Sequence, residues 1–193
     1  MVYPYGAELP GHLDPGWIAL AQLPPAIGCP TVFGDGSHPT TRLCATAVDF
    51  FCRQWRSEAA VLDVGTGSGV LARIARARGA QFVAATDIDP VALARAKAHS
   101  DLDAHQVGIH FSSDAPDHWG ARFDVVVANI LEAPLRALAP ALCRALRPGG
   151  VLLLSGFTRL QMPGLRVLFE NAGLTFGGHS DMDEWTVLTF RSQ

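Results

Sequence analysis

VLDVGTGSGVL, residues 61–71, decides the fold of this chain. Its apolar run ends in glycine, as a buried strand does, and the residues after the last glycine have the spacing of a helix. Gly65, Gly67 and Gly69 lie at this junction, where residues without a Cβ let the backbone approach a ligand and present its amides. Asp63 stands inside the end of the strand, where a carboxylate needs a polar or cationic partner. The stretch therefore predicts a strand, a ligand-binding loop and a helix.

Strands and helices alternate on both sides of this stretch. Apolar runs predict strands at 60–65, 81–87, 107–112, 123–130, 151–157, 174–179 and 184–191. Amphipathic segments predict helices at 39–55, 68–79, 89–100 and 159–173, and one from residue 132 that a Pro-Gly-Gly turn ends at 148–150. Repeated units of this kind predict an α/β fold, a doubly wound and mostly parallel seven-stranded sheet, with a C-terminal antiparallel strand pair.

The first thirty residues differ in composition from the rest of the chain. Residues 1–30 hold six of the thirteen prolines and no basic residue, which predicts extended or turn-like structure. We expect this segment to be an arm that packs on the domain or acts as a lid over its site. Residues 31–193 are expected to form the single domain that carries the site.

The composition argues against several kinds of partner. The net charge is −3 and the pI about 6.1, so the basic surface that captures nucleic acid is not expected. No apolar run approaches the length of a membrane span, and the longest strand-like run, around 151–154, is short. Cys29, Cys44, Cys52 and Cys143 have no paired spacing and the seven histidines are dispersed, so neither a disulfide framework nor a metal site is expected. A cytoplasmic location follows.

A second acid lies at the end of the next predicted strand. Asp87 can accept hydrogen bonds from both hydroxyls of a ribose there. Its alternative role, the N-cap of the following helix, is better filled by Asp89. A dinucleotide fingerprint, G-x-G-x-x-G, would need a glycine where Val70 stands, so an NAD-dependent oxidoreductase is disfavoured.

Taken together, these residues resemble the S-adenosyl-L-methionine (AdoMet) signature of class I methyltransferases. The resemblance implies that Asp63 orients the glycine loop and faces the methionine ammonium, that Asp87 holds the ribose, and that Ile88 lies against adenine. It also implies that Asp114, after the third strand, contacts the adenine amino group. The alternative for Asp114 is a solvated acid in a turn.

The motifs over residues 31–193 resemble one family more closely, the PrmA family of bacterial methyltransferases, which trimethylate amino groups of a large-subunit ribosomal protein. The stretches that carry the resemblance are FGDGSHPTTRL at 33–43, VLDVGTGSGVL, ATDIDP at 85–90, FDVVVANILEAPLRALAP at 123–140, RPGGVLLLSG at 147–156 and a late EW at 184–185. In that family the first stretch closes over AdoMet. The resemblance thus assigns to the cofactor pocket Phe33, Gly34, Gly36, His38, Thr40 and Thr41. It assigns Asn129 to both the cofactor and the substrate side.

Several of these residues have a structural alternative, and two depart from the family pattern. His38, Thr40 and Thr41 could instead cap a turn or the start of a helix. Asp35 and Glu132 are carboxylates where the family usually has threonine and a small residue. Beside an acceptor site they would favour a cationic substrate, unless both simply face water. Family members also carry an N-terminal substrate-recognition domain, so this chain is expected to be a catalytic core without it.

The expected chemistry is methyl transfer to an amine of a protein or of a small molecule. Asn129 would orient the neutral amine, and His38, or Asp35 in its place, would remove its proton. The sequence leaves open an oxygen or sulfur acceptor on a small metabolite, as well as a non-catalytic AdoMet-binding module. It leaves the oligomeric state open too.

Overall fold

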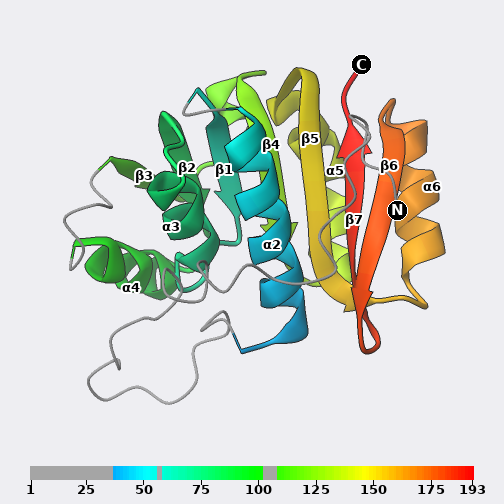
Figure 1. The fold of residues 1–193 in the computed structure, drawn as a ribbon, viewed down its shortest axis with the longest axis horizontal. Coiled ribbons are helices and arrows are strands. Elements are labelled where there is room, and N and C mark those ends of the chain that lie inside the picture. Colours follow the sequence, from blue (N-terminus) through cyan, green and yellow to red (C-terminus); the bar gives the residue numbers. More distant parts are fainter. Residues whose placement is uncertain (1–36, 56–57, 102–107) are drawn as a thin grey trace.

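The computed structural model describes residues 37–55, 58–101 and 108–193, which form one seven-stranded sheet with helices on both faces (Figure 1). The strand order is β3-β2-β1-β4-β5-β7-β6. The strands are β1 (Ala60–Val64), β2 (Phe82–Thr86), β3 (Ile109–Ser112), β4 (Phe123–Asn129), β5 (Leu146–Thr158), β6 (Thr175–Met182) and β7 (Trp185–Arg191). The helices are α2 (Pro39–Gln54), α3 (Val70–Ala77), α4 (Pro90–Asp101), α5 (Glu132–Ala145), α6 (Met162–Asn171) and the short 3₁₀ helix η2 (Pro116–Trp119).

The direction of the strands confirms the predicted fold class. Strands β1 to β5 pair in parallel, whereas β7 runs antiparallel to both β5 and β6. The chain steps from β1 outward to β2 and β3, and then back across to β4 on the other side of β1. This reversal creates the switch point between β1 and β4, where doubly wound sheets bind their ligands. The proposed arm at 1–30 lies outside the described residues.

Two apolar cores cover the two faces of the sheet. Val125 and Val127 of β4 pack in the core under α2 and α3, whereas Val126 and Ala128 pack in the core under α5 and α6. Successive side chains of a strand point to opposite faces, so a strand buried on both sides must be apolar throughout. This requirement explains why β4 reads as a continuous hydrophobic run.

The start of β5 differs from the prediction. Helix α5 ends at Ala145 and β5 begins at the next residue, so the expected Pro-Gly-Gly turn lies within the strand. Residues 147–150 are accommodated as an irregularity, because the pairing with β4 shifts between Phe123 and Val125. Gly149 takes a φ of +77° there, and its N–H donates to Ser192 at 3.2 Å. A hydrogen bond to a residue far along the chain thus helps to hold the Pro-Gly-Gly segment within β5, where the sequence predicts a turn that ends the helix.

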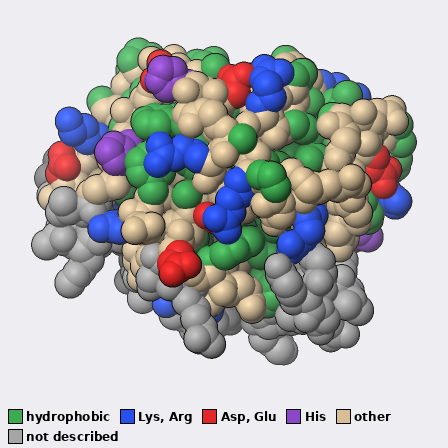
Figure 2. Space-filling model, turned by 90° about the horizontal axis from the view of Figure 1, so that it is seen from above, with side chains coloured by type: hydrophobic (Ala, Val, Ile, Leu, Met, Phe, Trp, Pro, Cys, Tyr) green, Lys and Arg blue, Asp and Glu red, His purple; other side chains and the backbone are tan. Residues whose placement is uncertain are grey.

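The edge of the sheet at the amino ends of the parallel strands carries ion pairs. Figure 2 looks onto this edge and shows basic and acidic side chains interspersed among apolar ones. Asp124, which is almost fully buried, accepts a hydrogen bond from the Ala60 N–H at 2.8 Å and pairs with Arg147. These contacts join β1, β4 and β5 at the edge that faces away from the switch point.

The opposite edge collects the connections that follow β1, β2 and β4, together with the start of α2, at the bottom of Figure 1. The polar residues singled out in the sequence therefore meet at one edge. None of the described helices combines the length and the apolar character needed to cross a membrane.

Candidate functional site

The loop between β1 and α3 is shaped by its glycines. The N–H groups of Gly65 and Thr66 both donate to the Thr86 carbonyl, at 2.8 and 3.0 Å, which ties the loop to the end of β2. Gly65 has a φ of +70°, and a Cβ on it would lie 2.2 Å from Cγ2 of Ile130. Gly69, in the left-handed region, begins α3. These positions need glycine, and the resulting turn leaves a helix N-terminus beside the loop.

The side chain of Asp63 fixes the loop between β1 and α3. Its Oδ2 accepts hydrogen bonds from the Thr66 hydroxyl at 2.6 Å and from the Ala72 N–H in the first turn of α3 at 3.1 Å. The side chain is buried, and burial raises its pKa from 3.8 to about 6, with a smaller contribution from the negative charge of Asp87. A cation bound nearby would favour the ionised carboxylate. The geometry is that of a loop-orienting acid.

The two acids after β2 have separate roles. Asp87 accepts the Gly67 N–H with one oxygen and the Asp89 N–H with the other, both at 3.0 Å. Asp89 accepts the Val91 N–H at 2.8 Å, so it caps α4 as the sequence predicts. Ile88, between them, is 94% exposed. An apolar side chain held in solvent beside a carboxylate is a suitable surface for a nucleoside.

Asp114 lies in an exposed turn after β3. Its N–H donates to the Ser112 hydroxyl at 3.0 Å, that hydroxyl donates back to its carboxylate, and His118 lies 3.7 Å away. The Ser112 carbonyl accepts the Asp87 N–H at 3.3 Å. The turn is therefore next to Asp87. This position is compatible both with a contact to an adenine amino group and with a solvated acid in a turn.

His38 forms the N-cap of α2. Its Nδ1 accepts the Thr40 N–H at 3.3 Å and lies 2.8 Å from the Thr40 hydroxyl. An N–H that donates to Nδ1 requires an unprotonated nitrogen there, so the proton of the neutral ring lies on Nε2. The ring also meets Trp185 edge-on, with centroids 4.7 Å apart. The capping alternative is thus the arrangement observed.

Asn129 brings a buried acceptor to the end of β4. Its amide nitrogen donates to the hydroxyl of Thr41 at 3.4 Å, which joins α2 to β4. Its Oδ1 is buried, and no described residue donates a hydrogen bond to it. An unsatisfied buried carbonyl costs free energy, so this oxygen is a candidate acceptor for a donor on a ligand. Thr40 and Thr41 are both fully buried.

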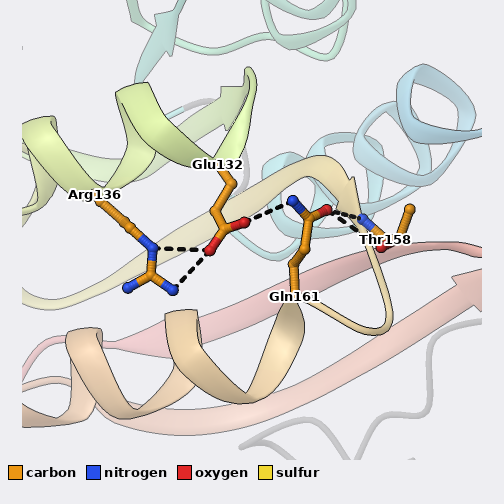
Figure 3. A network of polar contacts seen from close by, with 4 residues as sticks. All are labelled: Glu132, Arg136, Thr158 and Gln161. Carbon is orange, nitrogen blue, oxygen red and sulfur yellow. Dashed lines mark hydrogen bonds and ion pairs between the residues drawn. The ribbon is translucent and has the colours of Figure 1, made fainter.

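Glu132 is already engaged in a network of side chains (Figure 3). One carboxylate oxygen accepts from Arg136 and the other from Gln161, and both contacts lower the pKa of the carboxyl group. The Arg136 guanidinium offsets its charge, which weakens the field that a cationic substrate would feel. Sequence reasoning missed Gln161, which it placed inside a helix expected at 159–173, whereas the residue precedes the first turn of α6.

Part of the expected site falls outside the described residues, namely Phe33, Gly34, Asp35 and Gly36. Within the described ranges, no group of three or more His, Cys, Asp or Glu side chains could hold a metal ion.

The described site fits AdoMet. The glycine loop lets a ligand approach the backbone closely, Asp63 offers a carboxylate that a cation would ionise, and Asp87 offers acceptors for hydroxyls. Ile88 offers an exposed apolar surface, and the buried Oδ1 of Asn129 accepts no hydrogen bond from the described residues.

Comparisons with known proteins point the same way. The family model for ribosomal protein L11 methyltransferase (PrmA) matches residues 27–193. The ribosomal protein L11 methyltransferase of Dechloromonas aromatica is 46% identical over 137 residues, which are 71% of this chain and 44% of that protein. The protein of the same name from Hydrogenovibrio crunogenus is 38% identical over 161 residues, 83% of this chain and 53% of that one. The chain thus spans about half the length of these relatives.

A solved structure gives the same result. The crystal structure of ribosomal protein L11 methylase from Lactobacillus delbrueckii subsp. bulgaricus superimposes with a TM-score of 0.69 at 27% sequence identity. The match covers 79% of this chain and 80% of that one.

Proposed function

This chain belongs to the PrmA family of ribosomal protein L11 methyltransferases, and from that membership we propose that it transfers methyl groups from AdoMet to an amine nitrogen of a ribosomal protein. The observation that carries the proposal is the buried Oδ1 of Asn129, which receives no hydrogen bond from any described residue. A neutral primary or secondary amine keeps at least one N–H group to donate to this oxygen while its lone pair attacks. A deprotonated oxygen or sulfur acceptor has no such hydrogen to offer, so the orphan carbonyl favours nitrogen.

The residues of the β1 and β2 connections would hold the cofactor. Asp63 would pair with the methionine ammonium, Asp87 would accept the ribose hydroxyls and Ile88 would lie against the adenine. The exposed acid Asp114, next to Asp87, would contact the adenine amino group. AdoMet supplies an electrophilic methyl group on a sulfonium.

The chain itself contributes positioning more than acid–base chemistry. Methyl transfer is an in-line displacement, so its rate depends on how well the nucleophile is aligned and kept from water. Asn129 is fixed by its bond to Thr41 and would aim the amine lone pair. His38 can accept a proton at Nδ1 only if Thr40 gives up its bond to that atom, which couples proton removal to a change at the start of α2. Asp35 remains the proposed substitute.

The proposal includes a cytoplasmic location. Cys44, Cys52 and Cys143 are free thiols in the described part of the chain, which fits a reducing compartment.

Two measurements test the function. Calorimetric titration with AdoMet is expected to give micromolar binding. Incubation with AdoMet and purified, unmethylated ribosomal protein L11 is then expected to raise the mass of that protein by whole methyl groups, which peptide mapping would place on lysine or the N-terminal amine. An unchanged mass of ribosomal protein L11, with AdoMet bound, would refute this protein as the acceptor. Absence of AdoMet binding would refute the enzyme.

A further inference from the structure

The side chain of Gln161 joins two connections at the carboxyl edge of the sheet (Figure 3). Its Oε1 accepts hydrogen bonds from the N–H and the hydroxyl of Thr158, at 2.8 and 3.2 Å, within the β5–α6 connection. Its Nε2 donates to the Glu132 carboxylate, at the first residue of α5, at 2.6 Å. Arg136 donates to the other carboxylate oxygen from Nε at 2.8 Å and approaches it with Nη2 at 2.7 Å. We call these four residues the clasp.

Only one orientation of the Gln161 amide satisfies all its partners. The Thr158 N–H must face an oxygen, and the Glu132 carboxylate must face a donor. A flipped amide would set an NH₂ group against an N–H and an oxygen against a carboxylate. Arg136 and Gln161 both keep the Glu132 carboxyl group ionised by lowering its pKa. The clasp is therefore a directional contact with a defined donor and a defined acceptor.

The segment that begins at Asn129 and ends at the clasp is held tightly on both sides. The Ile130 N–H donates to the Ser155 carbonyl at 3.1 Å, and a Cβ on Gly156 would lie 2.3 Å from the Ile130 carbonyl oxygen. The Ile130 side chain meets Gly65 on the other side. The segment between Asn129 and Glu132 therefore has little room to move.

The clasp lies on the side of Asn129 away from Asp63, Asp87 and Ile88. Those residues lie in or after β1 and β2, whereas Glu132 follows β4 and Gln161 follows β5, the next strand over. In this sheet order the clasp lies beside Asn129, between the ends of β4 and β5.

On the basis of the proposed function, we propose that the Glu132–Gln161 contact is a positioning device for methyl transfer. It locks the β5–α6 connection to the start of α5, and so it fixes the direction in which the Asn129 carbonyl presents itself to the acceptor amine. Glu132 then acts through Gln161 and not as a ligand of a cationic substrate, the role that the sequence suggested.

An exchange of the two side chains tests the contact. Gln161→Glu keeps the acceptor for Thr158 but sets two carboxylates against each other. Glu132→Gln removes the charged acceptor. The double variant Glu132→Gln/Gln161→Glu exchanges donor and acceptor, and so it restores the hydrogen bond at constant net charge. Glu170→Gln is the matched control, because Arg166 and Glu170 form an i,i+4 ion pair on α6 that lies outside the clasp.

We expect Gln161→Glu to lower kcat about tenfold or more, with the dissociation constant of AdoMet within about threefold of the original. The double variant is expected to recover kcat to within about threefold, and the control to keep it. A double variant as slow as Gln161→Glu, or a Gln161→Glu variant of unchanged kcat, would overturn the positioning role while methyl transfer by the original protein stood. An original protein that transfers no methyl group would overturn the proposed function, and with it the role of the clasp.

Discussion

Asp63 carries a pKa shift whose effect on stability can be given a sign. Its pKa is raised from 3.8 to about 6 in the folded protein, chiefly by burial. A carboxyl group whose pKa is raised by folding stabilises the folded state at a pH below its pKa in the unfolded chain. This contribution is lost as the pH rises through the folded-state pKa of about 6. The ionised carboxylate thus costs about 2–3 kcal/mol near neutral pH in the absence of a cation.

Asp63→Asn should remove this cost, since the amide oxygen can still accept from Thr66 and Ala72. We expect the free energy of unfolding of the variant, relative to the original, to increase by about 2–3 kcal/mol between pH 4 and pH 7.5. Urea denaturation of both proteins at several pH values measures the difference, in which the other carboxyl groups cancel. A difference independent of pH would show that Asp63 does not titrate in this range.

The Asn129 carbonyl, to which none of the described residues donates, gives a second prediction. Asn129→Ala should lower kcat about 100-fold, because the acceptor amine loses the group that orients it. The control is Thr41→Val, which breaks the same Asn129–Thr41 hydrogen bond but leaves the carbonyl in place. Single-turnover assays are expected to show a much smaller loss for the control. Equal losses would mean that the bond to Thr41, and not the carbonyl, matters.

In the β2–α4 connection, Asp87 and Asp89 are expected to differ in role, the first binding AdoMet and the second stabilising α4. Asp87→Ala should weaken AdoMet binding more than tenfold, or by about 1.4 kcal/mol, if both ribose hydroxyls are held. Asp89→Ala should instead cost about 1 kcal/mol of stability, because it removes the cap of α4. Calorimetry and thermal unfolding of both variants check the division. Loss of AdoMet affinity in Asp89→Ala alone would reverse the assignment.

The packing of β5 against the β4–α5 connection rests on one glycine. Gly156 and Gly173 share a φ of +94°, but a Cβ on Gly156 would meet the Ile130 backbone, whereas a Cβ on Gly173 would meet nothing within 4 Å. Gly173→Ala should cost about 1 kcal/mol for its backbone conformation alone. Gly156→Ala should cost several kcal/mol or fail to fold. Equal unfolding midpoints for the two variants would show that β5 can move away from the Ile130 backbone.

For the molecule as a whole, the sequence predicts well whatever depends on local chemistry. The apolar run of β4 and the Asp-Pro start of α4 depend on neighbours in the chain, and the structure confirms both. Predictions were incomplete where a partner lies far along the sequence. The irregularity at 147–150 depends on Ser192, and Glu132 is engaged by Gln161, 29 residues away. The sequence alone does not show these contacts, so it does not distinguish a Glu132 that binds substrate from a Glu132 that is hydrogen-bonded to other side chains.

The antiparallel direction of β7 has a practical consequence. Because this strand reverses, the chain leaves the sheet at the edge opposite the switch point, at the top of Figure 1, where the Ser192 N–H is bonded to the Gly150 carbonyl at 2.9 Å. A tether attached after Gln193 would therefore hold the molecule on a sensor surface by its far end. Immobilised in that way, it would turn the edge that bears Asn129 toward the solution.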